Sequence, residues 1–334
     1  MTATGTALTA ADPALVRRFA EALERLNPDG GKIGLAVSGG PDSMAMLLLA
    51  HAAIPGGFEV ATVDHGLRPE AADECALVVA ACEARGIPCE VLPVQVGSGN
   101  LQAEARRARY AALNTWASSR DLDAIATAHH VDDQAETFLM RLNRGSGLSG
   151  LAGVRESHVE DLSGLASFQF IRVLRPLLAM RRDELMHFVE KSGVRYATDP
   201  SNADKRFDRV KMRENLRACE WLDPVAVMRS ASLLGEAEEF IRYKIMQSCD
   251  QRLTNVGNTI EYRRSIDSFE NVEVIRELYR QQGKAPSRSD IASMVRQLME
   301  GNNACLNGIL VRSKRDNDGK VVWVFSEEPP RRTG

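Results

Sequence analysis

Short apolar runs alternate with longer helical patterns through the first half of the chain. Strands are expected at residues 32–38, 58–64, 88–96 and 123–128, and helices at residues 42–53, 69–85, 101–119 and 132–143. Strands joined by helices need right-handed crossovers, so they form a parallel sheet covered on both faces. The pattern therefore predicts an α/β fold with a doubly wound parallel sheet.

The pattern changes after residue 143. Four glycines occupy nine positions at residues 145–153, which predicts a loop. Later elements are expected as a strand near 170–174, a helix near 181–192, helices at 224–249 and 272–282, and a β hairpin formed by 308–313 and 321–326 around the turn sequence NDGK. We expect a flexible end over residues 1–20, an α/β domain over 21–220, and a mainly helical region over 221–334 that ends in the hairpin.

Composition limits the classes of protein that fit. A chain of 334 residues has room for roughly two domains. Its 42 basic and 45 acidic residues exclude a protein that coats nucleic acid by bulk charge, so a polyanion must meet a local patch.

The longest apolar run, 44–54, is too short to span a bilayer, and residues 1–12 lack the pattern of a secretion signal. We expect a cytoplasmic protein without a membrane partner. No C-x-x-C pair occurs among its six cysteines, and none of them is assigned a role.

A glycine- and serine-rich segment, SGGPDS at residues 38–43, links the first expected strand to the first helix. Its glycines let the backbone approach a ligand, its serine hydroxyls can donate hydrogen bonds, and the amides at the start of a helix point outward. These features are typical of a phosphate-binding loop. A carboxylate beside phosphate is repelled unless a cation lies between them, so Asp42 indicates Mg²⁺. A helix capped by Asp42 or Ser43, with no ligand, is the alternative.

Two further clusters follow from the expected topology. The segment DHGLR, residues 64–68, ends the second strand and should face the phosphate loop, because ligands bind at the carboxyl ends of parallel strands. Asp64 is expected to contact nucleotide or metal, with His65 beside the same cleft. Arg106 and Arg109 share one helix face and can clamp anions, although a solvated basic face explains them as well.

The segment AHHVDDQAET, residues 128–137, places two histidines and three carboxylates where the fourth strand ends. His129 and Asp133 stand four positions apart. A zinc site would find at most two or three mixed ligands here, so Mg²⁺ or polar contacts to a nucleotide are more economical.

A basic segment at residues 205–217 carries six cations against two acidic residues. Arg206, Arg209 and Arg213 form a stripe on the expected helix. The stripe, together with Arg172, Arg175, Arg181 and Arg182, predicts a patch that can follow a nucleic-acid backbone. An ordinary solvated helix face is the alternative.

Six motifs, SGGPDS, DHGLR, EARRARY, TAHHVDDQAET, RGSG and DPSN, occur in order over roughly residues 30–217 and resemble the tRNA(Ile)-lysidine synthase family. The first motif alone marks the wider group of PP-loop ATP pyrophosphatases. The resemblance implies that ATP with Mg²⁺ adenylates carbon 2 of the wobble cytidine in a CAU anticodon. Free L-lysine then displaces AMP and gives lysidine. The oligomeric state stays open, with a homodimer as one option.

Roles for individual residues are implied by the same resemblance. The ATP-binding positions are Ser38, Gly39, Gly40, Pro41, Asp42, Ser43, Asp64 and His65, with Asp42 as the metal ligand. The catalytic candidates are Asp42, Arg109, His129 and Asp133. The candidates for contact with the tRNA or the second substrate are Arg68, Arg106, Asp132, Glu136, Arg144, Gly145, Ser146, Gly147, Arg206, Arg209 and Arg213. Region 221–334 is expected to bind tRNA. Val210 departs from the family pattern, which commonly has an asparagine there.

Two other functions fit part of the pattern. A PP-loop tRNA thiolase shares the SGGPDS-type loop but normally needs C-x-x-C cysteines, which this chain lacks. A non-catalytic adenine-nucleotide sensor would share the sheet but would not need the histidines and carboxylates of residues 128–137.

Overall fold

The computed structural model describes residues 12–66, 70–97, 99–161, 170–198, 208–316 and 318–328. Two compact units divide the chain after Gly235. This division falls inside helix α10 (Pro224–Arg252) and not near residue 220, where the composition changes. In the described part of the chain, no helix combines the length and the apolar character needed to cross a membrane.

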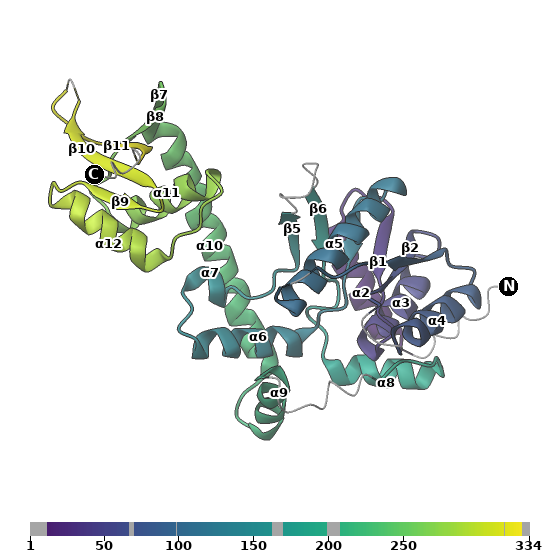
Figure 1. The fold of residues 1–334 in the computed structure, drawn as a ribbon. Coiled ribbons are helices and arrows are strands. Elements are labelled where there is room, and N and C mark those ends of the chain that lie inside the picture. Colours follow the sequence, from purple (N-terminus) through teal and green to yellow (C-terminus); the bar gives the residue numbers. More distant parts are fainter. Residues whose placement is uncertain are drawn as a thin grey trace. The chain divides into compact units, whose positions relative to one another are not determined.

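The first unit is built on a six-stranded sheet with the order β3-β2-β1-β4-β6-β5 (Figure 1). The strands are β1 (Ile33–Ala36), β2 (Phe58–Asp64), β3 (Cys89–Pro93), β4 (Ala124–Ala126), β5 (Ser157–Asp161) and β6 (Phe170–Leu174). All neighbours pair in parallel except β5, which runs antiparallel to β6 at one edge. The predicted parallel α/β fold is confirmed, and β5 is an addition to it.

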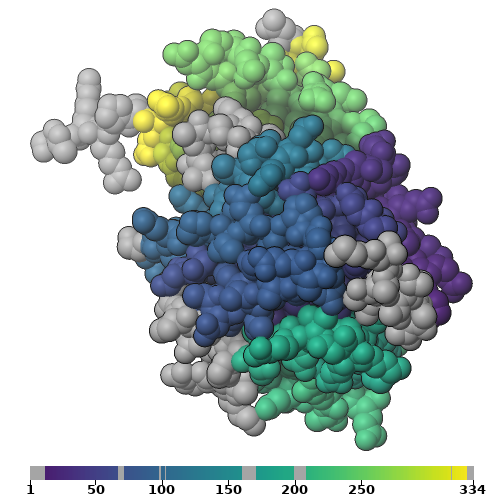
Figure 2. Space-filling view, turned by 90° about the vertical axis from the view of Figure 1, so that its right-hand side faces the viewer, coloured from purple at the N-terminus to yellow at the C-terminus, as the bar shows by residue number. Residues whose placement is uncertain are grey.

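Helices cover both faces of this sheet. The helices of this unit are α2 (Pro13–Leu26), α3 (Pro41–Ala53), α4 (Glu70–Glu83), α5 (Leu101–Ser119), α6 (Val131–Asn143), α7 (Leu148–Leu151), α8 (Arg182–Ser192) and α9 (Asp208–Ala218). The larger core lies under α2, α3, α4 and α8, and a second core lies under α5. In space-filling view, the purple to blue segment from α2 to α5 and the teal α8 form one continuous face (Figure 2).

Two expectations for the first unit need correction. Residues 13–20, expected in a flexible end, form the first half of α2, because Asp12 caps the helix and Leu15, Val16 and Phe19 are buried in the core. Residues 1–11 lie outside the described residues. The expected loop at 145–153 contains the single helical turn α7.

The second unit carries its own core on an antiparallel sheet of order β7-β8-β11-β10-β9. Its elements beyond α10 are β7 (Leu253–Val256), β8 (Thr259–Arg263), α11 (Ser268–Gln281), α12 (Arg288–Met299), β9 (Ala304–Leu306), β10 (Ile309–Arg315) and β11 (Val321–Glu327). Strands β10 and β11 are the expected hairpin. The other three strands and α12 are not predicted from the sequence, and with them this unit holds a full five-stranded sheet.

Candidate active site

The glycine loop after β1 leaves the start of α3 uncapped by any side chain. Gly40 occupies the N-cap position and Pro41 the first helical position. The Ser43 hydroxyl is engaged within the loop, because it donates to the Gly40 carbonyl at 2.9 Å and accepts from the Ser38 amide at 3.2 Å. Neither Asp42 nor Ser43 caps the helix, so its amides remain available to an anion.

Gly39 fits this loop because its backbone φ is +83°. A Cβ atom at this position would lie 3.0 Å from the carbonyl oxygen of Glu74 on α4. The Gly39 carbonyl accepts a hydrogen bond from the Ala197 amide at 2.8 Å. The loop is therefore held between α4 and the segment that follows α8.

A cavity of about 270 Å³ opens beside the loop, at the carboxyl ends of β1 and β2. Its walls include Ser38, Gly40, His65, Cys75 and Arg109. Burial, followed by repulsion from Arg106, lowers the pKa of the Arg109 guanidinium, which makes no ion pair with any described residue. Burial and then the charge of Arg109 lower the pKa of His65, whose buried Nδ1 has no hydrogen-bond partner among those residues. The cavity thus offers a ligand the guanidinium of Arg109 and the unpartnered Nδ1 atom of His65.

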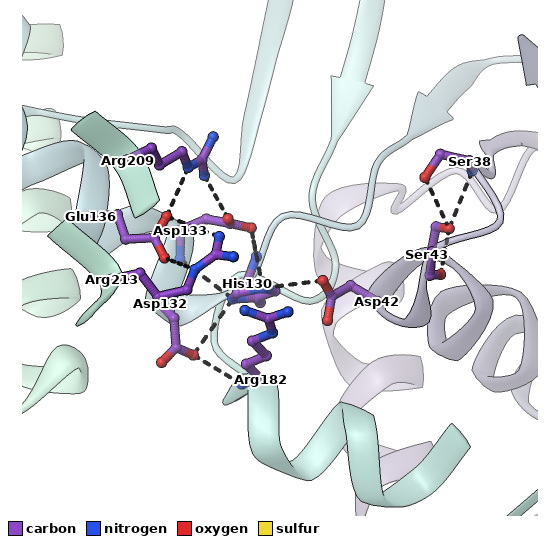
Figure 3. A network of polar contacts seen from close by, with 11 residues as sticks. Ser38, Asp42, Ser43, His130, Asp132, Asp133, Glu136, Arg182, Arg209 and Arg213 are labelled. Atoms are coloured by element: carbon purple, nitrogen blue, oxygen red, sulfur yellow. Dashed lines mark hydrogen bonds and ion pairs between the residues drawn. The ribbon is translucent and has the colours of Figure 1, made fainter. Parts of the chain in front are cut away.

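Asp42 connects the loop with the histidine at the start of α6. Its Oδ2 atom lies 3.6 Å from His130 Nε2 (Figure 3). The other oxygen, Oδ1, is buried and has no hydrogen-bond partner in the described structure. An unpartnered buried carboxylate oxygen beside an anion site is a suitable ligand for a cation.

His130 is surrounded by three carboxylates. Besides Asp42, its ring lies 3.5 Å from Asp132 and 3.4 Å from Asp133. Burial disfavours the charged ring, but the hydrogen bonds to Asp132 and Asp42 raise the pKa of His130 to about 10. Burial likewise opposes ionisation of Asp132, yet the hydrogen bonds from His130 and from the Arg182 amide lower the pKa of Asp132 to about 2. The three carboxylates therefore favour the protonated form of the His130 ring.

Two arginines of α9 reach the same cluster. Arg209 bridges Asp133 at 2.6 Å and Glu136 at 2.7 Å, and Arg213 lies 2.7 Å from the other oxygen of Glu136 (Figure 3). Only 1% of the Glu136 side chain is exposed. Burial opposes its ionisation, but Arg213 and Arg209 lower its pKa. Glu136 thus anchors α9 on α6 and does not itself face solvent.

His129 has a different environment from its neighbour His130. Its Nδ1 atom lies 3.0 Å from the Thr127 hydroxyl and 3.3 Å from Arg175 Nε. Burial, and then the charge of Arg175, lower the pKa of His129 to about 3. His129 and Asp133, four positions apart in the sequence, are not in direct contact, because Asp133 bonds to His130 and Arg209 instead.

The structure places the other sequence candidates as follows. Asp64 accepts the Gly66 amide at 2.8 Å, beside the cavity. Arg106 stacks on Tyr110 at 4.6 Å from the ring centre, and Arg144 lies 3.6 Å from Asp208. Gly145, Ser146 and Gly147 lie between α6 and α7. Arg68, Arg206 and the DPSN segment lie outside the described residues.

Sequence reasoning missed His130 and Arg175 as members of the site. The sequence shows His130 only as one member of the segment 128–137. The signal that identifies it is its position directly before the helix, where its ring can meet the first turn. Arg175, which the sequence places in a basic patch, is only 5% exposed.

Known proteins resemble this chain over most of its length. A family model described as a PP-loop domain matches residues 12–219. The tRNA(Ile)-lysidine synthase of Zymomonas mobilis is 37% identical over 95% of both chains. That of Novosphingobium aromaticivorans is 39% identical over 95% of this chain and 94% of its own.

One solved structure supports the fold. The U34-tRNA thiolase NcsA of Methanococcus maripaludis aligns with a TM-score of 0.54 and 19% identity, over 67% of this chain and 81% of its own. Identity at this level shows a shared architecture and carries no information on the reaction.

Proposed function

The chain belongs to the tRNA(Ile)-lysidine synthase family, within the PP-loop ATP-binding proteins, and we propose that it joins L-lysine to carbon 2 of the wobble cytidine of tRNA(Ile) with a CAU anticodon. ATP first adenylates the C2 oxygen and releases pyrophosphate. The amine of lysine then attacks carbon 2, and AMP leaves. Activation is needed because a carbonyl oxygen is a poor leaving group.

The observation that carries this proposal is the similarity to two lysidine synthases over 95% of the chain. The site agrees with it chemically. The uncapped start of α3 can bind phosphate oxygens through backbone amides, and Arg109 supplies a cation in the adjoining cavity. His65 lines the same cavity and can contact the nucleotide through its open Nδ1.

Magnesium fits this loop as a partner of ATP. Within the described ranges, no group of three or more histidine, cysteine, aspartate or glutamate side chains is arranged to hold a metal by itself. Mg²⁺ commonly binds through one or two carboxylates, with phosphate oxygens and water completing its shell. Asp42, with its unpartnered Oδ1, would supply the carboxylate. When bound, the ion would neutralise charge on the phosphates.

The cytidine, the lysine and the tRNA backbone are assigned to residues outside the nucleotide loop. We assign His129 and Asp133 to orienting the cytidine and the lysine, because the charges of Arg109 and Arg209 both act on His129, and Asp133 contacts Arg209 of α9. Arg144, the segment 145–147, Arg209 and Arg213 would follow the tRNA backbone, with Arg68, Arg106 and Arg206 as further cations. The second unit would extend the tRNA contact.

The test is a mass measurement on digested nucleosides. The chain is incubated with ATP, Mg²⁺, L-lysine and a CAU-anticodon transcript, and a transcript with another anticodon serves as the control. A cytidine heavier by one lysine less water, only in the first transcript, supports the proposal. A nucleoside that gains sulfur would support a thiolase, and an unchanged cytidine would contradict both.

A further inference from the structure

Arg175 is a buried cation that faces two histidines. It follows β6 directly, and only 5% of its surface is exposed. Its Nε atom donates to His129 Nδ1 at 3.3 Å, and its Nη1 atom lies 3.0 Å from His158 Nδ1 and donates to the Arg155 carbonyl. The contact with Arg175 holds the His129 ring in place and also affects which of its two nitrogens carries the proton.

The chemistry of the two side chains determines the tautomer of His129. A guanidinium carries only donors and stays protonated in proteins. Because Arg175 Nε–H points at Nδ1 of His129, that nitrogen must accept, and the single ring proton must lie on Nε2. The Thr127 hydroxyl, 3.0 Å from the same Nδ1, can donate to it as well.

The charges around His129 also favour the neutral ring with a single proton. Arg175, Arg109 from α5 and Arg209 from α9 disfavour a second proton on the ring, whereas Asp133 from α6 favours it. Burial and these three cations keep the ring uncharged. Both hydrogen bonds recorded for the ring among the described residues end at Nδ1, which leaves the Nε2–H group available to a substrate.

We propose that Arg175 is a positioning residue that holds His129 as a neutral Nε2–H hydrogen-bond donor for an anionic substrate oxygen. The inference rests on the proposed function for the identity of that oxygen, which is a phosphate oxygen of ATP or of the adenylated cytidine. In this arrangement His129 does not act as a general base, because a protonated Nε2 has no lone pair to offer. A neutral imidazole can still stabilise negative charge as it develops.

Nuclear magnetic resonance on the full chain labelled with ¹⁵N-histidine tests the tautomer without reference to activity. We expect His129 to show a protonated Nε2 and an unprotonated Nδ1 from pH 5 to pH 9. The Nδ1–H tautomer, or titration of this ring near its ordinary value of about 6.5, would overturn the proposal. This readout stands even if no lysidine forms, so failure of the proposed function and failure of the inference are distinguishable.

Substitutions of His129 test the donor in the reaction. His129→Gln places its amide N–H near the position of Nε2, whereas His129→Asn places it near Nδ1. We expect kcat for His129→Gln to exceed that for His129→Asn by about tenfold. This is the change in rate expected when one hydrogen bond to a charged acceptor is lost in the transition state. Equal values, or a higher kcat for His129→Asn, would contradict the proposal. His187→Gln, on the exposed side of α8, is the matched control and should retain full kcat.

Substitution of Arg175 tests the positioning role through pH. In Arg175→Met the ring is free to adopt the Nδ1–H tautomer at high pH, whereas protonation at low pH restores an Nε2–H. The ratio of variant to wild-type kcat should therefore rise as pH falls through the freed pKa of His129. A ratio that is low but constant with pH would mean a merely structural role and would overturn the inference. If Arg175→Met does not fold, the resonance experiment on the wild type decides alone.

Discussion

The Nε2 atom of His130 lies 3.6 Å from Oδ2 of Asp42, so the first turn of α6 is joined to the glycine loop at the start of α3. The same ring contacts Asp132 and Asp133, and Asp133 in turn contacts Arg209. A chain of charges thus runs from the proposed phosphate site to α9. Each link of this chain can be tested separately.

Replacing His130 should destabilise the first unit. His130→Gln removes the positive charge that lies against Asp42, Asp132 and Asp133. Asp133 keeps Arg209, whereas Asp42 and Asp132 lose their side-chain cation among the described residues. Breaking such a buried pair commonly costs about 3–5 kcal/mol. Urea unfolding measures the change, and a loss below about 1 kcal/mol would show that the ring is not charged in the folded protein.

The His130 contribution should also depend on pH. Its folded-state pKa of about 10 lies above the unfolded value of about 6.5, so the stabilisation is complete below pH 6.5 and is lost as pH rises toward 10. The difference in unfolding free energy between wild type and His130→Gln should shrink over that window. A difference that stays constant from pH 6 to pH 10 would refute the imidazolium.

Glu136 should control the docking of α9. Glu136→Gln leaves Arg209 and Arg213 without the buried carboxylate that both contact. We expect faster hydrogen exchange in residues 208–218 and a loss of about 3 kcal/mol in unfolding free energy. Glu21→Gln is the control, because its ion pair with Arg17 is exposed and should contribute less than about 1 kcal/mol. An unchanged rate of amide hydrogen exchange in α9 of Glu136→Gln would contradict the role of Glu136 as an anchor for this helix.

The two loop glycines should differ in their tolerance of a side chain. Gly39→Ala forces a φ of +83° on an L-residue and brings Cβ to 3.0 Å from the Glu74 carbonyl, so we expect a loss of at least about 1–2 kcal/mol. Gly40→Ala keeps an ordinary φ of −71°, and its Cβ meets only the Ser38 hydroxyl at 3.8 Å. Urea unfolding of the two variants compares them directly. Equal losses would contradict this account of the loop.

Arg109 should contribute to nucleotide affinity. Arg109→Gln removes the cation from the cavity wall. We expect ATP affinity to fall at least about tenfold, which is the change expected when one charge-assisted hydrogen bond is lost. Arg107→Gln, two positions earlier on the exposed side of α5, should bind ATP like the wild type. Calorimetric titration with ATP gives both values, and equal affinities for the two variants would exclude Arg109 from the site.

The sequence predicted the first unit well because its signals are local. A phosphate loop needs glycines and serines between a strand and a helix, and parallel sheets need long crossovers, so both follow from neighbouring residues. Strand β5 escaped notice because its pairing with β6 places Ser157 opposite Leu174, a relationship that no short window contains. Strands β7, β8 and β9 belong to local hairpins, because Gly257-Asn258 turns β7 into β8 and Asn307-Gly308 turns β9 into β10. The prediction from the sequence did not use these two turn signals.

The candidate site was predicted in composition but not in its pairings. Residues 128–137 were recognised as chemically important, yet which histidine meets which charge depends on tertiary structure. His130 meets Asp42 because α3 and α6 start at the same edge of the sheet, and His129 meets Arg175 because β6 lies beside β4. Periodicity alone gives neither contact.

Calorimetric titration of ATP into wild type and Asp42→Asn, with and without Mg²⁺, shows whether Asp42 holds a magnesium ion beside the bound nucleotide. A carboxylate beside phosphate repels it unless a cation lies between them, so without metal the variant should bind ATP more tightly than the wild type. With Mg²⁺ the order should reverse, because only the wild type offers the Asp42 oxygen to the ion. A ratio of the two dissociation constants that does not change with Mg²⁺ would contradict the account.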